Sequence, residues 1–94
     1  MKLVGRNILD AFTRKHTDAR KWIENWITDV KGAKWTCFQD IRDRYPRADH
    51  LGDNKIIFDV KGNNYRMEVQ VAYKRGVVSV KWAGTHPEYD KKYK

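Results

Sequence analysis

Cysteine is the scarcest reactive residue in this 94-residue chain, which contains only Cys37. One thiol cannot form a disulfide within the chain, so the sequence excludes the disulfide framework of small secreted domains and favours a reducing, cytoplasmic location. Cys37 is either a nucleophile or a packing residue. It lies among Trp35, Phe38 and Ile41 at helical spacing, which favours packing.

Long hydrophobic runs are also missing. No stretch approaches the ~18 consecutive apolar residues of a membrane-spanning helix. The apolar run within residues 1–5 is too short for a signal peptide. We therefore expect a protein without a membrane partner.

Metal-binding and nucleotide-binding motifs are absent as well. His16, His50 and His86 show no four-residue spacing, and the sequence has no His-Glu-x-x-His, no Cys-x-x-Cys and no glycine-rich phosphate loop. The sequence thus predicts no metal ion and no other cofactor. His50 falls in the polar, turn-prone segment 46–54 and is either a plain loop residue or part of a site.

Positive charge is what the chain has in excess. Its 20 Lys and Arg residues against 12 Asp and Glu residues give a net charge of +8 and an isoelectric point near 9.7. This balance favours a polyanionic partner, either a nucleic acid or an acidic protein surface. The length predicts a single domain over residues 1–94 with one modest core.

Strand-forming residues dominate the second half. Residues 55–60, 65–73 and 77–83 are rich in β-branched and aromatic residues, and glycine-containing turns separate them at 61–64 and 74–76. Two such turns predict an antiparallel meander. Residues 3–4 are expected to be a strand that joins it.

Helical patterns occupy the first half. Asn7 is a good N-cap for a first helix. Thr17 or Asp18 can cap a second helix, which is expected to end near Gly32. Residues 36–39 match a capping box for a third helix, which is expected to end before Pro46. The order is therefore β-α-α-α-β-β-β. It predicts an α+β fold with the N-terminal helices packed on one face of a twisted antiparallel sheet.

Alternation along the strands sorts their side chains onto two faces. The predicted core face carries Phe58, Val60, Met67, Val69, Val71, Tyr73, Val78, Val80 and Trp82. The predicted open face carries Asp59, Lys61, Arg66, Glu68, Gln70, Ser79 and Lys81. Such a polar face is either simply solvated or a binding surface.

The remaining polar residues suit RNA cleavage without a metal ion, in which the ribose 2′-hydroxyl attacks the adjacent phosphate. This reaction needs a proton acceptor, a cation beside the phosphorane and a proton donor for the leaving oxygen. Arg66 offers a planar guanidinium for the phosphate, and Lys81 offers a second positive charge. His86 can act as acid or base, and a helical turn would place Asp90 on the same side as His86.

Each of these residues also has a structural alternative. His86 could be only a turn residue before Pro87. Tyr89 could be a packing anchor for the C-terminus, or it could stack on a base or transfer a proton with a pKa lowered by nearby lysines. Three lysines are assigned to RNA phosphates, namely Lys61, Lys91 and Lys92. The alternative is that each is ordinary surface charge. The tail 91–94 reads as a frayed basic end.

Three segments resemble the HigB-type toxins of the RelE/ParE superfamily. They are residues 58–66 (Phe-Asp-Val-Lys-Gly-Asn-Asn-Tyr-Arg), a second strand of the same length, and residues 84–91 (Gly-Thr-His-Pro-Glu-Tyr-Asp-Lys). The similarity extends over nearly the whole chain. The pairing of a Gly-Asn-x-x-Arg hairpin with a later Thr-His-x-x-Tyr-Asp segment is specific, whereas either half alone is weak.

The resemblance implies a RelE-like fold whose sheet uses the side away from the helices. It implies a toxin that cleaves mRNA in the A site of translating ribosomes and is inhibited by a HigA-type helix-turn-helix antitoxin. The residues that match the motif are Arg66, His86, Tyr89 and Asp90. Two positions depart from the expected pattern: Lys81 stands where we expect arginine, and Pro87 replaces a helix former and is expected to shift the turn.

Two other classes of function remain open at this point. The chain could be a non-enzymatic toxin that binds a protein target, as ParE-like members bind gyrase, or a plain RNA-binding module. The cluster of proton-transfer residues favours the nuclease over both.

Overall fold

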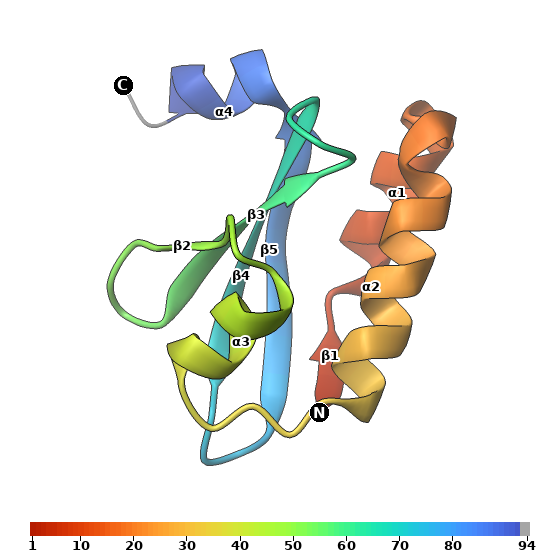
Figure 1. Cartoon of the computed structure of the whole chain (residues 1–94). Coiled ribbons are helices and arrows are strands. Elements are labelled where there is room, and N and C mark those ends of the chain that lie inside the picture. The colour runs from red at the N-terminus through yellow and green to blue at the C-terminus, as the bar shows by residue number, and fades with distance from the viewer. Residues whose placement is uncertain (93–94) are drawn as a thin grey trace.

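The computed structural model describes residues 1–92 and contains one five-stranded sheet in the order β1-β5-β4-β3-β2 (Figure 1). In chain order the elements are β1 Lys2–Val4, α1 Arg6–Lys15, a 3-10 turn Thr17–Ala19, α2 Arg20–Gly32, α3 Phe38–Arg44, β2 Asp49–His50, β3 Lys55–Val60, β4 Tyr65–Ala72, β5 Val77–Thr85 and α4 His86–Lys92. Of the tail expected to fray, residues 91–92 belong to α4, and residues 93–94 lie outside the described part.

The predicted α+β class is confirmed, because α1 and α2 precede the meander and cover one face of the sheet (Figure 1). β1 joins the meander as expected. It pairs in parallel with β5, so the sheet is mixed rather than wholly antiparallel. Within residues 1–92 no helix is both long enough and apolar enough to cross a bilayer.

The starts of the helices differ from those predicted. α1 begins after Gly5, whose φ of 93° and close approach to β5 admit only glycine: a Cβ there would lie 2.6 Å from the Val80 carbonyl oxygen. Asn7 therefore lies inside α1. The expected cap Asp18 accepts a hydrogen bond from the Tyr65 hydroxyl at 2.7 Å instead, and α2 begins two residues later at Arg20.

The start of α3 also differs in detail. The Asp40 carboxylate, not Gln39, accepts hydrogen bonds from the backbone N–H and the hydroxyl of Thr36, at 2.9 and 3.0 Å. Cys37 is the residue before α3 and is exposed, so the prediction that it packs in the core is wrong.

The core lies between the helices and the face of the sheet that carries Phe58. This ring is 1% exposed and meets Trp26 of α2 and Tyr45 after α3, both edge to face, with centroids 5.5 and 5.2 Å apart. Such aromatic pairs add stability beyond their buried area. Phe58 therefore ties the meander to the helical layer.

A β-bulge in β5 changes one face assignment. Glu68 pairs with Trp82, whereas the next residue, Val69, pairs with Val80, so Lys81 is an extra residue in β5. An extra residue moves every later side chain to the opposite face. Trp82 therefore shares the face of Arg66 and Glu68, and its predicted place in the core is wrong.

Truncating Phe58 should cost about 3–5 kcal/mol of unfolding free energy, because Phe58→Ala leaves a cavity between both aromatic neighbours. Leu51→Ala removes an apolar side chain that is 43% exposed, so it should change the unfolding free energy by less than about 0.5 kcal/mol. Urea denaturation followed by tryptophan fluorescence measures both. Equal losses for the two variants would contradict this core.

Candidate active site on the open face

Helix α4 positions the C-terminal group of site residues. Residues at its own N-terminus cap it. The Thr85 hydroxyl accepts a hydrogen bond from the Glu88 backbone N–H at 3.2 Å, and a Glu88 carboxylate oxygen accepts one from the Thr85 N–H at 2.9 Å. This is a reciprocal capping box. Pro87 falls in the first turn, where a backbone N–H has no helical acceptor, so its expected shift of the turn does not occur.

The start of α4 is fixed to the β3–β4 hairpin. The His86 backbone N–H donates to the Asn64 carbonyl oxygen at 3.1 Å. From there the helix runs across the end of the sheet (Figure 1). His86 Nδ1 lies 3.0 Å from an Asp90 carboxylate oxygen, one helical turn away. The predicted sharing of one side by these two residues is thus confirmed.

Arg66 lies beneath this helix and is 13% exposed. Its guanidinium carbon is 5.9 Å from the centre of the Tyr89 ring, so the structure brings the β4 arginine and the α4 residues together. One terminal nitrogen, Nη1, contacts Asp59 at 3.1 Å and the Tyr65 carbonyl at 3.3 Å, and Nη2 donates to the Asn63 side chain at 2.7 Å. These contacts fix the orientation of the guanidinium.

The Asp59 carboxylate forms ion pairs with two arginine side chains. One carboxylate oxygen contacts Arg66, and the other lies 3.3 Å from Nε of Arg47, which is on the segment between α3 and β2. The carboxylate is 17% exposed. Sequence reasoning found Asp59 on this face but assigned no role to Arg47, because nothing in the spacing of residues 47, 59 and 66 shows that they meet.

Trp82 is the second residue that sequence reasoning missed. Its ring centre lies 6.2 Å from that of Tyr89, and the Lys92 ammonium lies 5.7 Å from it. A Cβ on Gly84 would lie 2.6 Å from the indole, so this glycine leaves room for the ring on the open face. A glycine two residues after a strand tryptophan was the one available signal, and it is a weak one.

Burial raises the pKa of the Tyr89 phenol, and Asp49 raises it further, an effect that Arg66 opposes only in part. The expectation that lysines lower this pKa is therefore wrong. The Tyr89 hydroxyl keeps its proton at neutral pH and can donate it in a hydrogen bond.

The predicted RNA-binding lysines lie at three places. Lys61 is in the turn after β3, with a φ of 51°, and lies 3.4 Å from Asp18, so its predicted place on the open face is wrong. Lys81 is exposed at the bulge. Lys91 and Lys92 are exposed on α4 and line a shallow depression with Trp82 and Glu88.

His50 lies away from this group. It is exposed on the edge strand β2, opposite Ile56, and its ring centre is 5.4 Å from that of Phe38 in α3. Among residues 1–92 no three His, Cys, Asp or Glu side chains are arranged to hold a metal ion.

The candidate site on the open face consists of an arginine, a tyrosine, a histidine–aspartate pair and a tryptophan.

One comparison with known proteins bears on this arrangement. A family model named HigB_toxin, described as the RelE-like toxic component of a toxin-antitoxin system, matches residues 19–92. The matched range includes the strands β2, β3, β4 and β5 and the whole of α4. No curated protein matches the chain.

The capping box predicts an acid-sensitive α4. Hydrogen bonds from Thr85 lower the pKa of Glu88 from its ordinary value of 4.5, so the stabilisation is present above pH 4.5 and is lost as the pH falls through the folded-state pKa. Amide-exchange protection factors of α4 should therefore fall on acidification. In Glu88→Gln, which keeps the hydrogen-bonding shape without titrating, they should depend less on pH. The same loss in both proteins would contradict the role of this carboxylate.

Proposed function

Because the chain belongs to the HigB family of RelE-like toxins, we propose that it is a ribosome-dependent endoribonuclease that cleaves mRNA in the A site without a metal ion. One observation carries the proposal. Helix α4 brings Tyr89 over Arg66 and holds His86 against Asp90 on one face of the sheet. Those are the three kinds of group that phosphodiester cleavage by the 2′-hydroxyl requires.

In the proposed reaction His86 is the base. Its Nδ1 faces Asp90, and a carboxylate at that position favours the tautomer with the proton on Nδ1 and a free lone pair on Nε2. Nε2 takes the proton of the 2′-hydroxyl as that oxygen bonds to phosphorus. The imidazolium that results is stabilised by Asp90.

Tyr89 is the proton donor. Since its raised pKa keeps the phenol protonated, it can donate to the 5′-oxygen as the bond from that oxygen to phosphorus breaks. The products are a 2′,3′-cyclic phosphate and a 5′-hydroxyl. Arg66 stabilises the charge on the phosphorane from a partly buried position, where an ionic interaction is stronger than in water.

The partners follow from the same assignment. A toxin of a toxin–antitoxin family has an antitoxin, and we propose one of the HigA helix-turn-helix type. The exposed lysines that we assign to mRNA phosphates are Lys81, Lys91 and Lys92, whereas Lys61 lies against Asp18 and is left out. A ribosomal substrate requires a cytoplasmic location.

Induced expression of the wild-type chain should stop growth and leave mRNA cut within codons. His86→Ala and Arg66→Ala should each slow cleavage by about 10²–10⁴-fold, the usual contribution of a positioned acid–base or charge-stabilising group, and the double variant should be non-toxic. His50→Ala is the matched control and should remain toxic, because His50 lies on the other side of β2. Growth curves and mapped mRNA 5′ ends measure these effects.

Full toxicity of the double variant would overturn the catalytic assignment. Growth arrest with intact mRNA and inhibited DNA supercoiling would instead identify a ParE-like toxin that acts on a protein. Tight RNA binding with neither cleavage nor growth arrest would identify a plain RNA-binding module.

A further inference from the structure

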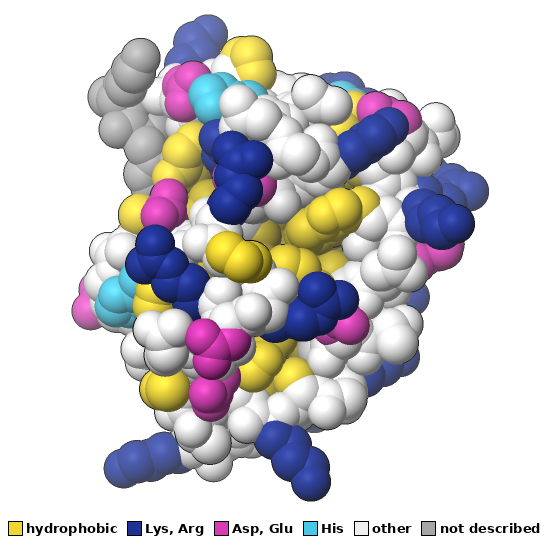
Figure 2. All heavy atoms as spheres, viewed as in Figure 1, with side chains coloured by type: hydrophobic (Ala, Val, Ile, Leu, Met, Phe, Trp, Pro, Cys, Tyr) yellow, Lys and Arg dark blue, Asp and Glu magenta, His cyan; other side chains and the backbone are white. Residues whose placement is uncertain are grey.

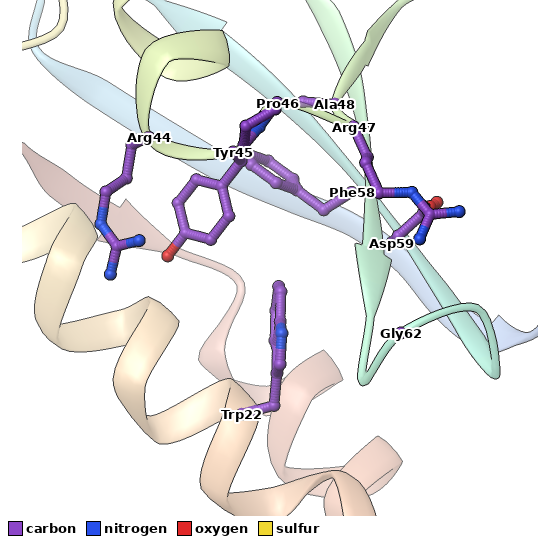
Figure 3. Close-up of a pocket in the computed structure, with 9 residues that line it drawn as sticks. All are labelled: Trp22, Arg44, Tyr45, Pro46, Arg47, Ala48, Phe58, Asp59 and Gly62. Carbon is purple, nitrogen blue, oxygen red and sulfur yellow. The ribbon is translucent and has the colours of Figure 1, made fainter.

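Arg47 is the exposed member of the pair of arginines on Asp59. Its side chain is 69% exposed, against 13% for that of Arg66. In Figure 3 Arg47 and Asp59 lie together on the β3 side of a cavity of about 190 Å³, and Arg44 lies on the α2 side. Figure 2 shows Lys and Arg side chains around the hydrophobic hollow in this region.

The two guanidinium groups differ in which atoms are occupied. Each terminal nitrogen of Arg66 makes at least one contact within the protein, with Asp59, Asn63 or the Tyr65 carbonyl. Arg47 contacts Asp59 through Nε alone, and within residues 1–92 no hydrogen bond or ion pair involves its terminal nitrogens. Arg47 can therefore keep its contact with Asp59 and bind an anion at the same time.

The backbone around Arg47 is held in place. Pro46 fixes φ on one side, and on the other Ala48 is 2% exposed and donates a backbone hydrogen bond to the Tyr45 carbonyl at 3.0 Å. A charged group on a fixed segment binds a ligand at a lower entropic cost than one on a mobile loop. Because Arg47 is mostly exposed and Asp59 is already paired with Arg66, the Arg47–Asp59 contact adds little to stability, so stability alone does not account for it.

We propose that Arg47 binds an RNA phosphate directly and, through Asp59, forms a two-arginine phosphate site with Arg66; this rests on the proposed action on RNA. Asp59 pairs with Arg66 across β3 and β4, and Arg66 pairs with Gly84 of β5, so the site continues the row of residues that leads to α4. Two guanidinium groups on one carboxylate leave a net positive charge at that point. A guanidinium matches the geometry of a phosphate better than an ammonium does.

The arrangement also supplies a second cation beside the reacting phosphate, the role that sequence reasoning gave to Lys81. Arg47 reaches the site from the helical half of the chain, whereas Lys81 is carried by the bulge in β5. RNA crossing the open face would thus meet cations from both halves of the fold.

The test measures binding of a fluorescent single-stranded oligonucleotide in which every sugar is 2′-deoxy, so that it cannot be cleaved by 2′-hydroxyl attack. The logarithm of the dissociation constant is followed against the logarithm of the salt concentration. Arg47→Ala should weaken binding and lower the slope by about 0.7, the value for one phosphate contact with a single strand. Arg47→Lys should keep the slope but bind less tightly, because an ammonium cannot bind Asp59 and a phosphate through separate edges.

Arg44→Ala is the matched control. Arg44 is also exposed, at 60%, and paired, with Asp29 at 2.8 Å, but its partner belongs to α2 rather than to the sheet. This variant should bind like the wild type. Thermal unfolding confirms that each variant is folded.

An unchanged slope in Arg47→Ala, an equal loss in Arg44→Ala, or no measurable binding by the wild type would each overturn this inference. The outcome is independent of the proposed cleavage, because the oligonucleotide has no 2′-hydroxyl and only its binding is measured. If the wild type binds through Arg47 yet ribosomal mRNA stays intact, the nuclease proposal fails and the phosphate site stands.

Discussion

The docking of α4 onto the open face of the sheet is the constraint on which the site depends. Without it, Arg66 would lie on a polar sheet surface, away from the α4 residues with which we propose that it acts. The reciprocal hydrogen bonds of Thr85 and Glu88 start the helix, and the His86 backbone ties it to the β3–β4 hairpin. The aromatic ring of Tyr89 then covers the guanidinium.

This use of one face is possible because the main core is built on the other face. Phe58 and its aromatic neighbours pack between the helices and the sheet, so the main core does not include the polar side chains of the open face. The open side can then hold groups that would be costly in a core. Arg66 and Asp59 are both largely covered there, but each is paired, which offsets the cost of removing a charge from water.

Sequence patterns predicted the class of the fold and the meander, because alternation and turn residues are local signals, and helical spacing predicted that His86 and Asp90 share one side of a turn. They failed where the deciding contact is distant in the chain. Trp82 was placed in the core because an alternating pattern cannot show the extra residue at Lys81. Arg47 was missed because its partner Asp59 belongs to another element. The pKa of Tyr89 was predicted in the wrong direction because it depends on the burial of this side chain when α4 packs on the sheet.

The position of Tyr89 can be measured directly in solution. Two-dimensional NMR should show nuclear Overhauser contacts from the Tyr89 ring protons to the side chains of Arg66 and Trp82. The Arg66 side-chain resonances should carry a ring-current shift that disappears in Tyr89→Leu. If the ring shows no contact with either residue and the shift is absent, α4 does not cover this face, and the proposed site does not exist as described.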